Sequence, residues 1–248
     1  MAKKKQNWEP TCKRFVAFLD IMGFKDMVFR NEHQEVYDMF ESLRPAINTI
    51  QLIAKFASKS KKGGIVKPII FSDSIILISN DISQNAYEWM IFDIQWIIRN
   101  AIEKGIPIKG AISCGLQTAE FRKSLFFGKP LIEAYELQKE LQLYGVVLHH
   151  TIEKRLIDLE SLKKIDNDYI ICKYPVPTKS GKITHYILDW TIFCKYWKED
   201  ALILVNLLYN NVSGTPRVYV DNTLEFVKWS MAYQAELPLK NADRPVRN

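Results

Sequence analysis

The sequence predicts an α+β fold, in which a β-α-β-β-α-β core is followed by an additional C-terminal hairpin and helices. Three observations lead to this prediction. Short apolar runs with polar ends, which are typical of buried strands, alternate with longer stretches of helical periodicity. A two-residue connection joins two of these runs, as in a hairpin. The chain has 248 residues, 48% of them apolar, which is enough for one large domain with a substantial core.

The core elements follow one another without an internal repeat. Gly23 comes almost directly after the first strand, and Gly105 gives the second long helix a C-terminal stop. Ser72 and Asp73 form the tight connection of the hairpin. This order is the ferredoxin-like or palm arrangement, in which the first strand lies centrally beside the hairpin. The expected elements are a strand at 14–20, a helix at about 32–58, strands at 66–71 and 74–79, a helix at about 84–104 and a strand at 107–114.

The second half of the chain is less regular. A second hairpin is expected around the Lys-Ser-Gly turn at 179–181. The other expected elements are a helix at 130–143, a strand at 145–148, a helix at 150–164, the hairpin strands at 168–174 and 184–189, and helices at about 191–209 and 221–236.

Composition narrows the class of protein. The apolar and charged fractions exclude wholesale disorder, and no apolar run reaches the roughly 18 residues of a membrane span. Lys3 to Lys5 are not followed by an apolar stretch, so we expect no secretory signal. Four scattered cysteines without a C-x-x-C pair indicate reduced thiols in a cytoplasmic protein. The net charge of +6 suits an anionic small molecule, and because the basic runs lack interleaved aromatic residues we expect neither a nucleic-acid nor a membrane partner.

Two aspartates stand out because each interrupts an apolar stretch. Asp20 ends the first strand, and Asp73 lies at the hairpin turn between runs of Ile and Leu. In the predicted strand order both carboxylates reach one edge of the sheet, where they would bind two divalent ions, Mg²⁺ or Mn²⁺, with positions left for phosphates. Gly23 would let backbone N–H groups approach those phosphates. Turn chemistry or helix capping explains either aspartate alone, whereas the pair favours metal binding.

Four segments in this order resemble class III nucleotidyl cyclases. The resemblance covers about residues 13–145 and is strongest to the short, stand-alone pyrimidine cyclases of the bacterial Pycsar antiphage system. Residues 18–24 (FLDIMGF) resemble the first metal motif, 71–74 (FSDS) the second metal position, 107–115 (PIKGAISCG) the next core strand, and 127–137 (FGKPLIEAYEL) the following strand and helix.

The resemblance implies a role for each residue of the first motif. Asp20 and Asp73 would bind both metals, and the backbone carbonyl of Ile21 would complete one metal shell. The backbone of Gly23 and Phe24 would contact the β- and γ-phosphates. The 3′-hydroxyl of a nucleoside triphosphate would attack its own α-phosphate, releasing pyrophosphate and a 3′,5′-cyclic nucleotide. Phe18, in the same motif, is also assigned to substrate binding.

One departure bears on the substrate. Purine cyclases of this class carry an Asn and an Arg one turn apart on the helix after the Gly128 position, and the matching residues here are Ile132 and Glu136. The resemblance therefore favours a pyrimidine cyclase, with UTP preferred over CTP. Lys109, on the strand near Asp73, is the candidate for the missing cation, and a solvated strand lysine is the alternative interpretation.

The resemblance also implies partners and domain limits. It implies a homodimer with shared active sites, a role as a second-messenger generator in antiphage defence, and a separate effector that senses the cyclic nucleotide. The expected parts are a flexible N-terminus (1–12), a cyclase catalytic domain (13–190), a C-terminal helical extension on the core or the dimer interface (191–237) and a loose tail (238–248).

Two other classes of function stay open. One is a cyclase-like domain that has lost catalysis and binds nucleotide as a regulator. The other is an RNA-binding domain on the same scaffold, which would need exposed stacking aromatic residues on the central strands.

Overall fold

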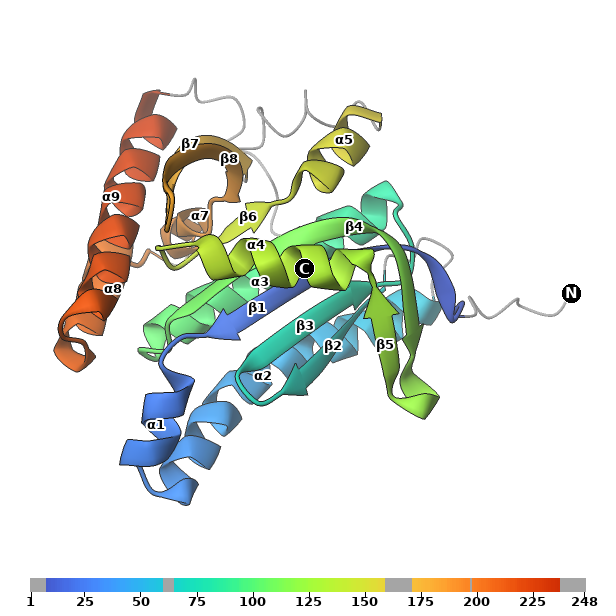
Figure 1. The fold of residues 1–248 in the computed structure, drawn as a ribbon, viewed down its shortest axis with the longest axis horizontal. Helices are drawn as coiled ribbons and strands as arrows, with labels where there is room; N and C mark the ends of the chain where they lie inside the picture. The colour runs from blue at the N-terminus through green and yellow to red at the C-terminus, as the bar shows by residue number, and fades with distance from the viewer. Residues whose placement is uncertain (1–7, 60–64, 159–170, 197, 237–248) are drawn as a thin grey trace, which may run out of the picture.

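The computed structural model describes residues 8–59, 65–158, 171–196 and 198–236. Figure 1 shows a twisted sheet with helices on both faces and a group of helices beside the later strands. The first half of the chain has the expected β-α-β-β-α-β order. Its elements are β1 (Thr11–Ile21), α1 (Phe24–Arg30), α2 (His33–Lys59), β2 (Val66–Phe71), β3 (Ser74–Ser79), α3 (Gln84–Glu103) and β4 (Ile108–Glu120).

Among the described residues the sheet has eight strands, and β1 lies inside it. The strand order is β2-β3-β1-β4-β6-β8-β7, and β5 pairs with β4 outside this path. β1 is antiparallel to β3 on one side and to β4 on the other. Six consecutive residues of β1, Arg14 to Leu19, are buried, which explains the almost continuous apolar run. The predicted central position of the first strand beside the hairpin is confirmed.

The two faces of the sheet are covered by different helices. Leu19 and Ile21 point to the same face, since alternate strand residues do so. Both belong to the main core, together with residues of α2 and α3. Val16 belongs to a second, smaller cluster, which includes Leu131 of α4. In Figure 1, α4 crosses the face turned to the viewer, and α2 and α3 lie behind the sheet.

The second half of the chain extends the sheet and adds helices. β6 pairs in parallel with β4, and the β7–β8 hairpin pairs with β6 through β8. Tyr174 of β7 contacts the rings of Phe226 and Trp229, so the last helix packs on this hairpin. The elements are β5 (Leu125–Gly128), α4 (Lys129–Glu140), β6 (Val146–Leu148), α5 (His150–Asp158), β7 (Ile171–Thr178), β8 (Gly181–Leu188), α7 (Thr191–Tyr196), α8 (Ala201–Leu207), a 3₁₀ turn (Leu208–Asn211) and α9 (Thr215–Glu236).

The start of the chain differs from the expectation. β1 begins at Thr11, three residues before the expected strand, and its additional residues pair with the second half of a β4 that continues to Glu120. Trp8 is held by a hydrogen bond from its Nε1 to the Ala119 carbonyl at 2.7 Å, and its ring lies 4.2 Å from the Arg14 guanidinium. Residues 8–12 are thus part of the packed fold, whereas residues 1–7 lie outside the described residues.

The prediction of one continuous helix at 191–209 is wrong, because the structure has two separate helices there, α7 and α8. Lys198 adopts a left-handed backbone conformation (φ 56°), and Asp200 begins a new helix by accepting a hydrogen bond from the Leu202 N–H at 2.8 Å. The last helix starts at Thr215, six residues earlier than expected. Much of the expected helix at 150–164 is present as α5, but residues 159–170 and the tail from 237 lie outside the described residues.

Within the described ranges, no helix combines the length and the apolar character that are needed to cross a membrane.

Candidate active site

A row of side chains crosses four strands at one end of the sheet. Asp20 on β1 lies opposite Ser74 on β3 and Lys109 on β4, and Phe71 on β2 lies opposite Ser74. Residues directly opposite each other in antiparallel strands point to the same face. The row therefore lies on the α4 side of the sheet, away from the main core.

A glycine brings β1 and β4 close together beside this row. A Cβ atom at Gly110 would lie 2.6 Å from the Leu19 Cδ2 atom and 2.6 Å from the Phe18 carbonyl oxygen. Real Cβ contacts are not this short, so only glycine fits between the two strands here. The close approach fixes the position of Lys109, the preceding residue, relative to Asp20.

Asp73 reaches the same end of the sheet from the β2–β3 turn. The turn is two residues long, with Ser72 in the left-handed region (φ 54°). The Ile21 N–H donates to the Asp73 carbonyl at 2.8 Å, which ties the turn to the end of β1. Burial raises the pKa of Asp20, the charge of Lys109 lowers it, and the charge of Asp73 raises it. The structure thus brings Asp20 and Asp73 together, as the sequence predicted.

Lys109 is a buried cation rather than a solvated strand lysine. Its side chain is 4% exposed, and its Nζ donates to the Leu141 carbonyl at 3.4 Å. Burial lowers the pKa of Lys109, and the charge of Asp20 opposes this shift. Among the described residues no ion pair within 4.0 Å joins Lys109 to Asp20. The two charges act on each other but remain apart.

The loop after β1 has the backbone form that a glycine allows. Gly23 is left-handed (φ 76°) and precedes the first residue of α1. A Cβ there would meet nothing within 4 Å, so the requirement is conformational and not one of space. The Phe24 side chain packs on Phe40 of α2, with ring centroids 5.6 Å apart. Its side chain is thus occupied, and only its backbone is available for the predicted phosphate contact.

The remaining predicted residues lie under and on α4. The Phe18 ring is 8% exposed and packs edge-to-face on Tyr135 at 5.2 Å, so it has little surface to offer a substrate. Ile132 is exposed, and Glu136 is paired with Lys139 at 3.2 Å. Neither of these two positions on α4 supplies a cation.

The donor atoms fit a hard divalent cation. Two carboxylates share the site. Burial first and then the charge of Asp73 raise the pKa of Asp20, and a cation between the two carboxylates would relieve their repulsion. No group of three or more His, Cys, Asp or Glu side chains in the described part of the chain could hold a metal. Any further ligands must therefore be backbone, water or substrate oxygens, and Mg²⁺ sites with one or two carboxylates and phosphates have this composition.

A cavity of about 440 Å³ adjoins the turn but is not this site. It opens between α2 and β2, and Ile70 and Ser72 line its sheet side. Ile70 lies opposite Ile75, which lies opposite Leu19, so it points to the α2 side of the sheet. The remaining lining residues are Phe40, Arg44, Ile47 and Asn48.

Sequence reasoning missed the contribution of α9. Tyr219 lies with its ring centroid 5.5 Å from the Lys109 Nζ, and the charge of Asp20 contributes to its raised pKa after burial. The tyrosine is 110 residues beyond Lys109 in the chain and belongs to no motif, so no local signal could have indicated this contact.

No model of a known protein family matches the chain, and no curated protein matches it. Solved structures do match. A bacterial light-regulated adenylyl cyclase is 12% identical, aligns over 82% of this chain and 100% of its own, and has a TM-score of 0.51.

Two other matches are enzymes of the same kind. The catalytic core of a rhodopsin-guanylyl cyclase with converted specificity, in complex with ATPαS, is 16% identical and covers 72% of this chain and 98% of its own (TM-score 0.49). The adenylyl cyclase CyaB from P. aeruginosa is 16% identical and covers 72% and 94% (TM-score 0.46). The likeness to the light-regulated adenylyl cyclase shows that the chain has the same α+β palm fold, which confirms the predicted fold class.

Proposed function

We propose that this protein is a metal-dependent nucleotide cyclase of class III. The observation that supports this proposal is the convergence of Asp20, Asp73 and Lys109 at one end of the central strands. Two carboxylates and one buried cation stand there on a fold shared with an adenylyl cyclase. A pair of acidic side chains beside a buried lysine suits the binding of a metal-bound triphosphate.

Each residue of this group has a task in the proposed reaction. Asp20 and Asp73 would hold one or two ions of Mg²⁺ or Mn²⁺, with the Ile21 carbonyl as a further ligand. When bound, such ions supply Lewis-acid stabilisation at the attacking and leaving oxygens. Lys109 places a positive charge beside the α4 face, where the triphosphate would lie. The left-handed Gly23 turns the backbone so that N–H groups there and at Phe24 can approach phosphate oxygens.

We propose a pyrimidine triphosphate as the substrate, UTP before CTP. Ile132 and Glu136 occupy the α4 positions where the resembling purine cyclases carry Asn and Arg, and Glu136 is already paired with Lys139. The resemblance to Pycsar cyclases leads us to place the product as a second messenger in antiphage defence, read by a separate effector protein.

We also propose a homodimer with shared active sites. Apolar side chains of β4, β5 and α4 are exposed. Those of α4 lie on the face of the sheet that carries Asp20, and those of β4 and β5 point to the opposite face by their register. Exposed apolar surface of this kind is typical of an interface. A second copy of the chain would cover it and would bring its own residues to the open side of the site. The residues concerned are Leu116, Leu125, Phe127, Ile132 and Tyr135.

The experiment is incubation of the purified protein with each of the four nucleoside triphosphates and Mn²⁺, with products resolved by mass. We expect a single 3′,5′-cyclic pyrimidine nucleotide. Asp73→Asn should lower the rate by at least about a hundredfold, because the charge at the metal position is lost. Asp38→Asn, at an exposed position of α2, is the matched control and should keep the wild-type rate. A cyclic purine product would overturn the pyrimidine assignment and keep the cyclase.

The second candidate is a nucleotide-binding regulator without catalysis. It is favoured by the lack of a cation at positions 132 and 136 of α4. Binding of nucleotide with no product from any of the four triphosphates would support it over a cyclase. The RNA-binding candidate is not favoured, because the aromatic residues of the central strand are buried on both faces. Phe15 packs on Tyr87 of α3, and Phe18 packs beneath α4.

A further inference from the structure

The ammonium group of Lys109 is held by a segment far from it in the chain. Its Nζ donates to the Leu141 carbonyl at 3.4 Å, which is a long hydrogen bond. On another side it faces the ring of Tyr219, whose centroid is 5.5 Å away, within the range of a cation–π contact. Because the Leu141 bond is long, the Tyr219 ring is a second contact that can hold the Lys109 ammonium.

Tyr219 is itself held by a ring contact and by hydrogen bonds of its helix turn. Its ring stacks on Tyr144, with centroids 5.8 Å apart and planes 19° from parallel. The Thr223 hydroxyl donates to the Tyr219 carbonyl at 2.6 Å and accepts from the Tyr144 N–H at 2.8 Å. Asn222 donates from its Nδ2 to the Gln142 carbonyl at 2.7 Å. One turn of α9 is thus bonded to the same loop, after α4, that supplies the Leu141 carbonyl.

The geometry points to Tyr219 as a positioning residue of the active site: its ring holds the Lys109 ammonium beside Asp20, aimed at the space that a triphosphate would fill. This inference deepens the proposed function and rests on it. The C-terminal helix is then part of the active site of its own chain, through one side chain.

The positive charge has a reason to be held apart from the carboxylate. A lysine left free beside Asp20 would close onto it as an ion pair, because opposite charges attract strongly when partly buried. Such a pair would neutralise a metal-binding carboxylate and remove the cation from the substrate. The aromatic ring and the Leu141 carbonyl give the ammonium other partners, and the separation from Asp20 is preserved.

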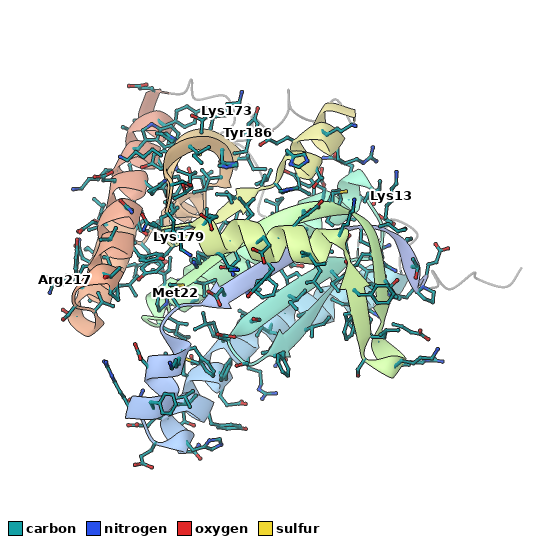
Figure 2. The ribbon with its side chains drawn as sticks, viewed as in Figure 1. Lys13, Met22, Lys173, Lys179, Tyr186 and Arg217 are labelled. Carbon is teal, nitrogen blue, oxygen red and sulfur yellow. The ribbon has the colours of Figure 1, made fainter. Side chains whose placement is uncertain are left out.

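Two other basic residues of this region, Lys179 and Arg217, differ from Lys109 in their exposure. Lys179 lies at the C-terminal end of α4, where its N–H donates to the Glu140 carbonyl at 2.9 Å, and its charge lowers the pKa of Lys109. Arg217 lies at the outer end of α9 in Figure 2, and its guanidinium lies over Tyr209. Both of these side chains are exposed, whereas Lys109 is buried under the ring.

The test is binding of inorganic tripolyphosphate in excess Mg²⁺, measured by calorimetry, because this probe needs no base and no turnover. Tyr219→Leu removes the ring face and should weaken binding about tenfold, the size of a desolvated cation–π contact. Lys109→Gln should weaken it by at least as much. Tyr219→Phe keeps the ring and should bind within about twofold of wild type.

Tyr233→Leu is the matched control for damage to α9. Tyr233 lies on the same helix, about 21 Å along it from Tyr219, and stacks on Trp229. It should lower the melting temperature as Tyr219→Leu does but leave tripolyphosphate binding unchanged. If Tyr219→Leu binds as wild type does, or if Tyr219→Phe loses as much as Tyr219→Leu, the inference is overturned.

A second readout does not depend on any ligand. Acylation of the Lys109 amine, followed by mass spectrometry, should be slow in the wild type and several-fold faster in Tyr219→Leu, with Tyr219→Phe unchanged. Lys13, exposed at the far end of β1 from Met22 in Figure 2, is the internal reference. If this pattern holds while no triphosphate is cyclised, the cyclase proposal fails and the positioning of Lys109 stands. Unchanged Lys109 acylation in Tyr219→Leu counts against the positioning role even if the enzyme is active.

Discussion

Asp93 is an acid buried on α3, away from the proposed site. Its side chain is 2% exposed, and its Oδ1 has no hydrogen-bond partner among the described residues. Burial raises the pKa of Asp93 well above its usual value. An isolated carboxylate is costly in such surroundings, so burial favours the protonated form of Asp93 in the folded protein.

We expect Asp93 to make the protein less stable as pH rises. Above about pH 4 the unfolded chain releases this proton, while the folded chain retains it until its own raised pKa is reached. In that window the free energy of unfolding falls by up to about 1.4 kcal/mol per pH unit from this group. Asp93→Asn cannot ionise, so its stability relative to wild type should increase steadily with pH. Urea unfolding of both proteins from pH 4 to pH 8 measures the difference, and parallel curves would show that Asp93 ionises normally.

At the residue scale, some residues of the site could be predicted from the sequence and others could not. Asp20, Asp73 and Lys109 were predictable because each stands in an apolar strand pattern or in a tight turn, and the strand order brings those positions together. Phe18 was assigned from its motif, but its ring is buried against Tyr135. Tyr219 was not predictable, since only the packing of α9 on the loop after α4 brings it to Lys109.

The anchoring of α9 is a property of the whole helix. Its C-terminal half is tied to a buried acid, Asp189, which follows β8. Asp189 accepts hydrogen bonds from the Thr191 hydroxyl at 2.7 Å, from the Ser230 hydroxyl and from the Gln234 Nε2 at 2.9 Å. Its backbone carbonyl accepts from Gln95 of α3 at 2.9 Å. This cluster joins three elements that are far apart in sequence.

Ser230→Ala should loosen α9. It removes one donor from a fully buried acid and should cost about 1–3 kcal/mol in the free energy of unfolding. Amide hydrogen exchange in residues 215–236 should accelerate more than in β1, because the change acts at the helix contact. Ser213→Ala, at an exposed position before the helix, is the control and should leave both quantities unchanged. Equal acceleration in β1 and α9 would contradict a local anchor.

The elements were predictable where the local pattern was strong. β2 and β3 have the expected bounds, because a two-residue turn and two apolar runs leave little freedom of register. The break in the expected helix at 191–209 depends on Asp200 as a cap and on Lys198 in a left-handed conformation. The capping signal was present in the sequence, whereas the strained lysine had no pattern. The early start of α9 follows Gly214 and has Pro216 in its first turn, which is a recognisable start signal.

At the scale of the whole molecule, exposed apolar side chains gather on β4, β5 and α4. Ile132 of α4 is on the face that carries Asp20 and Lys109, whereas Leu116 and Phe127 point to the opposite face by their register. Leu116 and Ile132 are each 62% exposed, and Phe127 is 57% exposed. A lone chain gains nothing from exposing so much apolar surface, and a second copy of the chain is the partner that we propose for it.

We therefore expect the protein to be a dimer that Phe127→Glu separates. Light scattering after size-exclusion chromatography should give twice the chain mass of 28.9 kDa for wild type and the single mass for the variant. Because Phe127 is exposed in the single chain, the variant should change folding stability by no more than about 0.5 kcal/mol. Ile203→Glu, at a similarly exposed position of α8, should remain a dimer. Cyclisation should fall together with dimer content in Phe127→Glu, because each site would lose the residues of the second copy. A wild-type protein that is monomeric at every concentration, yet active, would show that one chain holds the complete site.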